Sequence, residues 1–127
     1  MRKIKIIEHV SLDGVIQAPG GPEEDPSDGF NYGGWTAPLN DREGGAAIVA
    51  AHEYWTHILR EADLLVYGRK TYQLMVPFWP DVAKSQSMTK ALNEFALAFD
   101  SLDKVVFSRS LDHVDDGNTR IVHEPVR

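Results

Sequence analysis

The chain has 127 residues, a formal net charge of −6 and no cysteine. This length suits a single domain with a core of its own. Without cysteine there can be neither a disulfide nor a thiolate metal site, and the cytoplasm is the expected compartment. The sequence predicts no signal peptide and no apolar run near the roughly 20 residues that cross a bilayer. The acidic charge, with no basic stripe, argues against nucleic-acid binding.

The beginning of the chain predicts a strand. Residues 3–10 contain β-branched apolar side chains at Ile4 and Ile6, which are typical of strands. Residues 11–17 are expected to continue this strand, with a break at Asp13 and the glycine that follows it.

A long loop is expected at residues 18–34, because glycine, proline and acidic residues dominate this segment and leave no packed element. Loops of this length in small domains are usually functional or disordered. The aromatic residues Phe30, Tyr32 and Trp35 at its far end leave two interpretations open. The loop is either a flap that closes over a ligand or a segment that its aromatic side chains anchor to the core.

The rest of the chain alternates predicted helices and strands. Asn40 or Asp41 is the expected N-cap of the first helix, and the two strands that follow read as buried on both faces. Such alternation predicts right-handed crossovers and a mostly parallel sheet, which defines the α/β class. The expected helices are residues 41–60, 69–75 and 89–99, and the expected strands are 64–67, 104–107 and 119–123.

The sharpest chemical signal is a buried strand that runs directly into Gly68 and then into a helix. Glycine lets the backbone approach a ligand closely, and the free N–H groups of a first helical turn favour an anion. Arg69 and Lys70 add positive charge at this point, and Thr71 adds a hydroxyl donor. The pattern predicts a phosphate site. The other interpretation is a plain turn with solvated cations.

A second signal, Ser108-Arg109-Ser110, follows the next strand. Parallel strands end on the same edge of a sheet, and ligands bind outside that edge. Arg69 and Arg109 are therefore expected to flank one phosphate, since the arginine fork binds phosphate oxygens in pairs.

Four short segments occur in a characteristic order: residues 11–16 (SLDGVI), 20–22 (GGP) leading to 33–35 (GGW), 68–72 (GRKTY) and 105–109 (VVFSR). Together they resemble the dihydrofolate-reductase-like family of riboflavin-biosynthesis reductase domains, also called bifunctional deaminase-reductase C-terminal domains. More specifically, the chain resembles the stand-alone bacterial members that lack the deaminase. The resemblance covers nearly the whole chain.

This resemblance implies a three-layer α/β/α sandwich with a mainly parallel central sheet. It also implies that the protein reduces a small planar heterocycle, pyrimidine- or pterin-like, with hydride from NADPH. The glycine-arginine turn would hold the pyrophosphate and 2′-phosphate side, the serine-arginine strand end the adenosine phosphate, and the turn after the first strand the nicotinamide. The implied cofactor-binding residues are Gly68, Arg69, Lys70, Thr71, Ser108, Arg109, Val15, Ile16 and Gln17.

Catalytic residues are less clearly marked. Dihydrofolate reductase has an acid at the start of its first long helix, and His52 and Glu53 fall near that position without a clean match. Glu53 is kept as a candidate proton donor, and Asp13 as a group that orients substrate or water, although an Asp-Gly pair also serves as ordinary turn chemistry. The expected substrate-side residues, each with a core or anchoring role as its alternative, are His9, Trp35, Met75 and Trp79.

Family members continue through a second glycine-rich turn and further strands, so residues 1–127 are expected to form one partial domain. Half a sheet would expose strand edges and apolar surface, and a homodimer is therefore expected. The histidines show no metal-ligand spacing, and no metal is expected. The alternative function is a non-catalytic nucleotide-binding or dimeric assembly module of the same fold.

Overall fold

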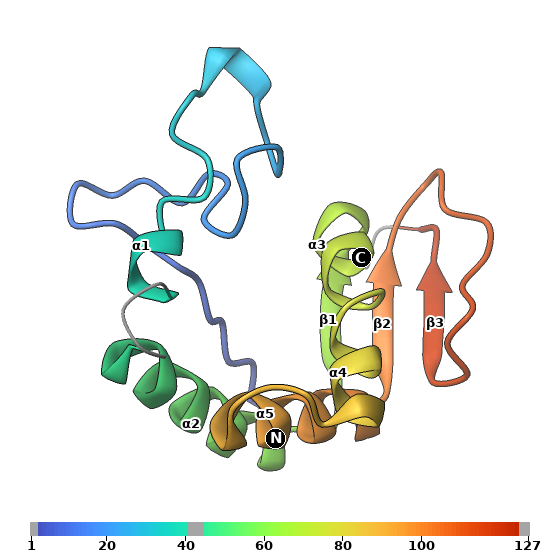
Figure 1. Cartoon of the computed structure of the whole chain (residues 1–127). Helices are drawn as coiled ribbons and strands as arrows, with labels where there is room; N and C mark the ends of the chain where they lie inside the picture. Colours follow the sequence, from blue (N-terminus) through green and yellow to red (C-terminus); the bar gives the residue numbers. More distant parts are fainter. Residues whose placement is uncertain (1–2, 41–44, 125–127) are drawn as a thin grey trace. The chain divides into compact units, whose positions relative to one another are not determined.

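The computed structural model describes residues 3–40 and 45–124, and it shows a mixed α/β chain (Figure 1). The chain divides into two compact units, Met1–Ile48 and Val49–Arg127, and each is described here by itself. The helices are η1 (Ser27–Gly29, a 3₁₀ helix), α1 (Ala37–Asn40), α2 (Ala46–Arg60), α3 (Arg69–Met75), α4 (Trp79–Ser85) and α5 (Lys90–Ser101). The strands are β1 (Leu65–Gly68), β2 (Lys104–Phe107) and β3 (Thr119–Val122).

The second unit contains a parallel sheet in the order β1-β2-β3, as the alternation of helices and strands predicts. Leu65 pairs with Lys104, which pairs in turn with Thr119, so these three residues lie side by side across the sheet. The predicted strand 104–107 is confirmed at both ends. The strand predicted at 64–67 lies one residue later, and the last strand ends one residue earlier than expected.

Helix α5 covers one face of this sheet. The rings of Tyr67 on β1 and Phe99 on α5 lie 6.2 Å apart, and the Lys104 ammonium lies 5.0 Å from the centre of the Phe99 ring. Phe99 is fully buried and forms the core with Phe95 and Leu59. Because the apolar side of α5 carries these rings at helical spacing, burial of that side fixes the helix on the sheet.

The two central strands differ in burial. β2 is buried on both faces, as predicted, whereas β1 alternates and leaves Val66 60 % exposed. The prediction that β1 is buried on both faces is therefore wrong. The physical reason is that only one face of β1 is covered: Leu65 and Tyr67 pack against the core, while Val66 on the opposite face is exposed.

The helices of the second unit agree only in part with those predicted from the sequence. α3 has the predicted bounds, while α5 begins one residue later than expected and extends to Ser101. α4 was not predicted, because its sequence begins at Trp79-Pro80 after another proline. Proline is favourable at the first helical positions, and Val82 and Ala83 then pack on Ala96 of α5.

The first long helix is shorter than predicted. α2 begins at Ala46 rather than at residue 41. Of its two expected caps, Asn40 ends the separate short helix α1, and Asp41 lies outside the described residues. Of the helices in residues 3–40 and 45–124, none has the length and apolar character that would take it across a membrane.

The strand predicted at residues 3–10 is not formed. This segment has no regular secondary structure, and Ile4 and Ile6 are 92 % and 88 % exposed. A strand is stabilised by the ladder to its neighbour, and no segment within the described ranges pairs with this one. Beyond it, Ser11 and Val15 close a tight turn around Gly14 instead of continuing a strand.

The loop at residues 18–34 is ordered by its own hydrogen bonds, although no packed element was expected there. The Glu24 carboxylate accepts from the backbone N–H groups of Gly20 and Gly21 at 2.6 and 3.1 Å. The Gly34 N–H donates to the Ala18 carbonyl at 2.8 Å and closes the loop. A Cβ on Gly33 would lie 2.7 Å from the Pro22 carbonyl oxygen, so close packing of backbone on backbone requires glycine there.

Candidate anion-binding site

The carboxyl ends of β1 and β2 lie together at one edge of the sheet. The register pairs Gly68 with Phe107, so the next residues, Arg69 and Ser108, leave the sheet at the same level. Parallel strands place their following loops on one side, which is the usual ligand side of such sheets. The two sequence signals are therefore brought to the same edge, as predicted.

A direct contact joins the two segments. The Arg69 guanidinium donates from Nη1 to the Ser110 hydroxyl oxygen at 2.7 Å. The Ser108 hydroxyl accepts from the backbone N–H groups of Ser110 and Leu111 at 3.2 and 3.0 Å, and this shapes the turn after β2. Ser108 thus positions Ser110, which in turn holds one arm of the Arg69 fork at the sheet edge.

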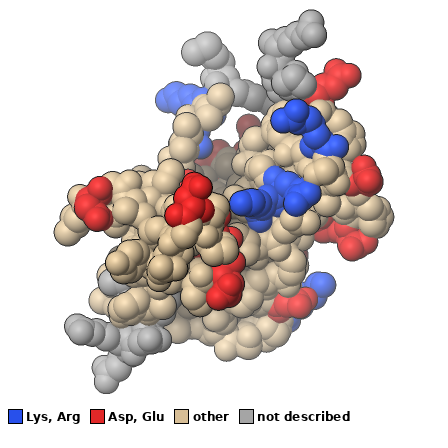
Figure 2. All heavy atoms as spheres, turned by 90° about the horizontal axis from the view of Figure 1, so that it is seen from above, with Lys and Arg blue, Asp and Glu red and all other residues tan. Residues whose placement is uncertain are grey.

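The cations at this edge are exposed. Arg69, Lys70 and Arg109 all have exposed side chains, as does Thr71. Arg109 forms no hydrogen bond or ion pair that involves the described part of the chain, and Arg69 uses one donor of several. Figure 2, seen from the side toward which the strand arrows of Figure 1 point, shows blue Lys and Arg side chains at several places on this side, with red Asp and Glu side chains among them. A local cationic surface in a chain of net charge −6 favours a bound anion.

Gly68 has a conformation that any residue can adopt. Its φ of −79° and ψ of 163° are ordinary extended backbone, and a Cβ built there would meet no atom within 4 Å. Neither backbone strain nor packing within the described residues explains glycine at this position. The missing side chain leaves open space above the sheet edge, directly beside Arg69. Since α3 is only seven residues long, the arginines rather than the helix dipole dominate the local electrostatics.

In the first unit, Asp13 is held in its own turn. Its carboxylate accepts from the Ser11 hydroxyl at 2.6 Å, and this hydrogen bond is the main cause of its lowered pKa. The Val15 N–H donates to the same Ser11 hydroxyl at 2.9 Å. These contacts account for Asp13 as turn chemistry, the second of its two interpretations.

The predicted nicotinamide contacts lie on a structured turn. The Gln17 side-chain amide donates to the carbonyl oxygens of Asp25 and Ser27 at 3.0 and 3.1 Å. Val15 is half-buried, and Ile16 is 56 % exposed. Gln17 therefore holds the loop at residues 18–34 from inside, while Ile16 presents an apolar side chain to solvent.

Trp35 is bonded to the base of the same loop. Its indole N–H donates to the Gln17 carbonyl at 3.0 Å, and the Thr36 hydroxyl donates to the Pro19 carbonyl at 2.6 Å. This geometry supports the anchoring interpretation of Trp35. Tyr32 is 77 % exposed and contacts Phe30 edge to face at 5.8 Å.

The remaining predicted residues are divided between surface and core. Glu53 is exposed on α2, and His9 is half-buried in the segment before the first turn. Met75 and Trp79 pack against the core around Phe95 and Phe99, which is the alternative that the sequence left open for them.

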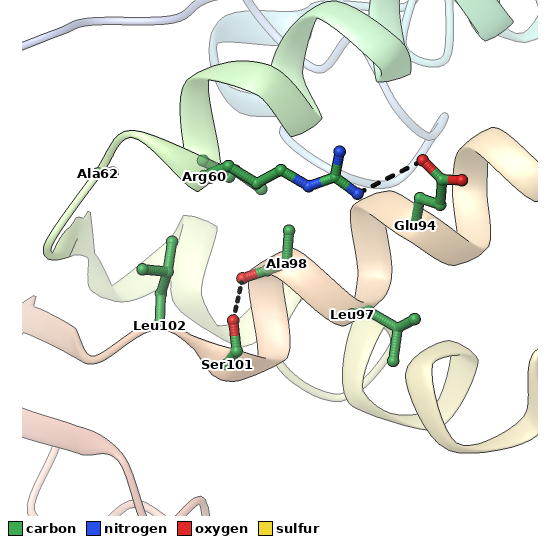
Figure 3. Close-up of a pocket in the computed structure, with 8 residues that line it drawn as sticks. Arg60, Ala62, Glu94, Leu97, Ala98, Ser101 and Leu102 are labelled. Atoms are coloured by element: carbon green, nitrogen blue, oxygen red, sulfur yellow. Dashed lines mark hydrogen bonds and ion pairs between the residues drawn. The ribbon is translucent and has the colours of Figure 1, made fainter.

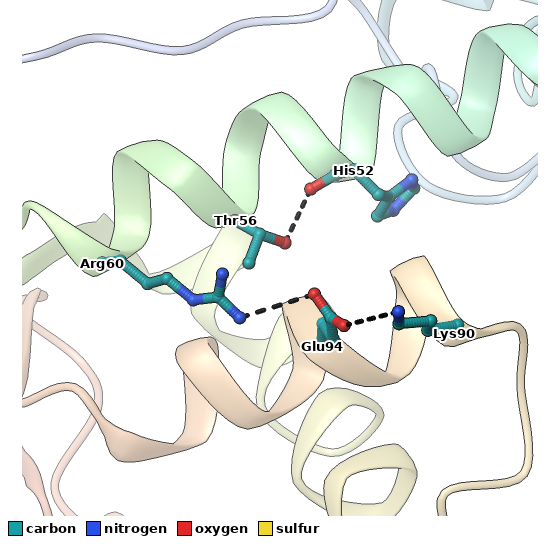
Figure 4. A network of polar contacts seen from close by, with 5 residues as sticks. All are labelled: His52, Thr56, Arg60, Lys90 and Glu94. Carbon is teal, nitrogen blue, oxygen red and sulfur yellow. Dashed lines mark hydrogen bonds and ion pairs between the residues drawn. The ribbon is translucent and has the colours of Figure 1, made fainter.

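Sequence reasoning missed a buried histidine among aromatic rings. His52 is 7 % exposed, and its ring lies 5.1 Å from Trp55, 5.2 Å from Phe95 and 5.8 Å from Trp79. The helical spacing of His52, Trp55 and Leu59 on α2 is the signal that could have placed it inside. Thr56, on the same helix, donates its hydroxyl to the His52 carbonyl at 2.7 Å (Figure 4).

A second missed group is a polar network at the start of β3. Tyr72 of α3 and Thr119 both donate hydroxyl hydrogen bonds to the Asp116 carboxylate. Burial, followed by the bond to Asp116, raises the pKa of Tyr72 to about 12. Nearby, the 2 % exposed Lys104 donates to the Leu102 carbonyl and to Asn118, and burial lowers its pKa. The polar groups of this network have hydrogen-bond partners within it, so we interpret the network as structural.

An open groove of about 410 Å³ runs between α2 and α5 (Figure 3). Ion pairs of Glu94 with Arg60 at 3.5 Å and Lys90 at 3.9 Å lie along it (Figure 4). Leu59, Leu97, Ala98 and Leu102 supply its apolar lining. None of the site residues that the sequence predicts lies in this groove.

The fold and the site together define a mixed α/β chain with a cationic edge on a parallel sheet. No cluster of three or more potential metal ligands is found among the residues that the structure describes. The chain matches no protein-family model and no curated protein.

Proposed function

We propose that the protein is an NADPH-dependent reductase of a small planar heterocycle, with a dihydrofolate-reductase-like arrangement. The observation that carries this proposal is the Arg69–Ser110 contact at the carboxyl edge of a parallel sheet. It joins the two segments that the family resemblance assigns to the cofactor phosphates. Bound NADPH would supply the hydride, and the protein would supply binding and orientation.

Three residues of the edge have distinct proposed roles. Arg69 offers its remaining guanidinium donors to the 2′-phosphate side, while Ser110 fixes the direction of the fork. Arg109, exposed and unpaired among the described residues, approaches the same anion from the neighbouring strand end. Gly68 leaves room for the phosphate to reach the backbone, because no protein atom lies where its Cβ would be.

Calorimetric titration of the full chain with NADPH and NADH tests this proposal. We expect Arg69→Ala to weaken NADPH about tenfold or more and NADH much less, since a charge-assisted hydrogen bond contributes roughly 1.5–3 kcal/mol. Arg120→Ala is the matched control, because Arg120 is exposed on β3 and lies two residues before the carboxyl end of that strand. Absence of NADPH binding, or equal losses in both arginine variants, would contradict the proposed site.

A test at Gly68 separates ligand space from folding. Gly68→Ala should leave the unfolding midpoint almost unchanged, because the backbone conformation suits alanine and the added methyl meets no atom. NADPH affinity should nevertheless fall, since the methyl occupies the proposed phosphate position. If Gly68→Ala and the wild-type protein bound NADPH with equal affinity, Gly68 would not be part of the binding site.

The second candidate is a non-catalytic nucleotide-binding or assembly module. The positions of the two predicted catalytic residues favour it: Glu53, the candidate proton donor, is exposed on α2, and Asp13, the candidate orienting group, is hydrogen-bonded within its own turn. Binding of NADPH without oxidation of NADPH by any pyrimidine or pterin offered would support this second function over the first.

A further inference from the structure

A histidine lies at the same edge of the sheet as the cationic turn. The register that pairs β1 with β2 continues from β2 to β3, and the first residues beyond the three strands are Arg69, Ser108 and His123. Because the strands are parallel, all three residues leave the sheet on the same side. His123 therefore belongs to the edge that carries Arg69, although neither of the two sequence signals contains it.

The His123 ring is held by a hydrogen bond to the end of β2. Ser108 directs both of its backbone groups toward β3: its N–H donates to the Val122 carbonyl at 3.1 Å, and its carbonyl oxygen lies 2.9 Å from Nδ1 of His123. A carbonyl oxygen can only accept, so Nδ1 carries a proton and donates it to this bond. Nε2 is then the ring nitrogen that gains or loses a proton, and it is directed away from the Ser108 carbonyl.

The charges at this edge couple the protonation of His123 to a bound anion. His123 is exposed, and no carboxylate among the described residues forms an ion pair with it. The charged residues at the carboxyl ends of the strands are three cations and one carboxylate: Arg69, Lys70, Arg109 and Glu124. A further positive charge among cations is unfavourable by itself and becomes favourable when an anion is bound.

We propose that His123 is a further anion-binding residue of this edge, and that its protonated form strengthens the binding of a phosphate-like dianion. The Arg69 fork reaches the turn after β2 from one side, where it donates to Ser110 at 2.7 Å. His123 reaches the same turn from the other side through its bond to Ser108. An anion above this turn would lie between the two side chains. This inference rests on the proposed anion site, but it does not depend on the reduction of a heterocycle.

Titration of the full chain with inorganic sulfate, followed by NMR of the backbone amides of Arg69, Ser108 and Ser110, provides the first test. Sulfate remains a dianion from about pH 6 to about pH 8, whereas a phosphate group itself titrates near pH 6. A histidine gains its charge in this range, so sulfate should bind about threefold or more tightly at the lower pH, at constant ionic strength. Equal affinity at the two pH values would overturn the proposal.

Two variants of His123 separate charge from structure. His123→Gln keeps an amide donor for the Ser108 carbonyl but cannot become charged, so it should bind sulfate weakly at both pH values. His123→Lys is charged at both and should bind sulfate tightly at both. His57→Gln is the matched control, because His57 is exposed on α2, where it pairs with Glu61 at 3.5 Å. If His123→Gln kept the pH dependence of the wild type, the proton would bind elsewhere and the proposal would be wrong.

Sulfate and NADPH together separate this inference from the proposed function. Sulfate binding that depends on Arg69 and His123, without any binding of NADPH, would support the anion site and contradict the cofactor. Loss of sulfate binding in Arg69→Ala but not in His123→Gln at about pH 6 would overturn the role of His123 alone. Sulfate binding that needs neither side chain, or no sulfate binding at either pH, would overturn the anion site and this inference with it.

Discussion

The two units of this chain are ordered by different interactions. The first unit has Ala18 and Ile48 as its buried apolar residues in the described part, and its loop is held by bonds from Gln17, Glu24 and Thr36 to backbone groups. The second unit is held by a buried aromatic core at Phe95 and Phe99. Hydrogen bonds define a shape but contribute only about 1 kcal/mol net each, whereas burial of large rings contributes most of the stability.

This difference explains which segments remain exposed. The first unit leaves Ile4, Ile6 and Leu12 in solvent because it has no apolar surface of its own to cover them. The second unit covers one face of its sheet with α5 and leaves the outer edge of β1 open.

The largest effect is expected in the core of the second unit. Phe99→Ala should lower the free energy of unfolding by about 3–5 kcal/mol, because Phe99 is fully buried and a cavity would remain. Chemical denaturation followed by tryptophan fluorescence measures this loss. Leu97→Ala on the same helix is the control, since Leu97 is 51 % exposed and should cost far less. Similar losses for both would show that α5 does not form the core.

An intermediate effect is expected in the first unit, and it should remain local. Gly33→Ala should destabilise the loop at residues 18–34 by about 1–3 kcal/mol, because the added methyl would overlap the Pro22 carbonyl. The measurement is amide exchange at Gly34, whose N–H bonds Ala18 in the closed loop. Gly21→Ala is the control, as a Cβ there meets no atom within 4 Å. Unchanged exchange at Gly34 would contradict the close packing.

The smallest effect concerns the polar network of the second unit. Tyr72→Phe should cost about 1 kcal/mol near neutral pH through loss of the hydrogen bond to Asp116. Because folding raises the pKa of Tyr72 from near 10 to about 12, its contribution is complete below the lower value and is lost as pH rises through the higher one.

The direction of this pH dependence is tested by measuring the free energy of unfolding of the Tyr72→Phe protein from pH 9 to about pH 12. Its stability should fall less steeply than that of the wild type, while Tyr67, whose pKa burial also raises, contributes equally to both. Tyr32→Phe serves as the control because Tyr32 is 77 % exposed. If the free energies of unfolding of wild type and Tyr72→Phe changed with pH in parallel, the network would not contribute to the stability of the fold.

The sequence by itself determined the elements whose pattern is local. Apolar periodicity and the glycine that ends β1 predict the buried run that forms β2, the bounds of α3 and the parallel order of the strands. The placement of Arg69 and Ser110 at one edge follows from the same order, because parallel strands end on the same side. The roles given to these residues stay predictions.

Only the tertiary structure decided the features that depend on distant partners. Residues 3–10 carry a strand pattern but form no strand, because a ladder needs a neighbour that no local pattern supplies. The Asp116 carboxylate accepts a hydrogen bond from Tyr72, which is distant in the sequence. The Trp35 indole donates a hydrogen bond to its own loop rather than facing an open cleft. Side-chain types set which contacts are possible, and the folded backbone selects those that form, because each contact requires groups brought together from separate parts of the chain.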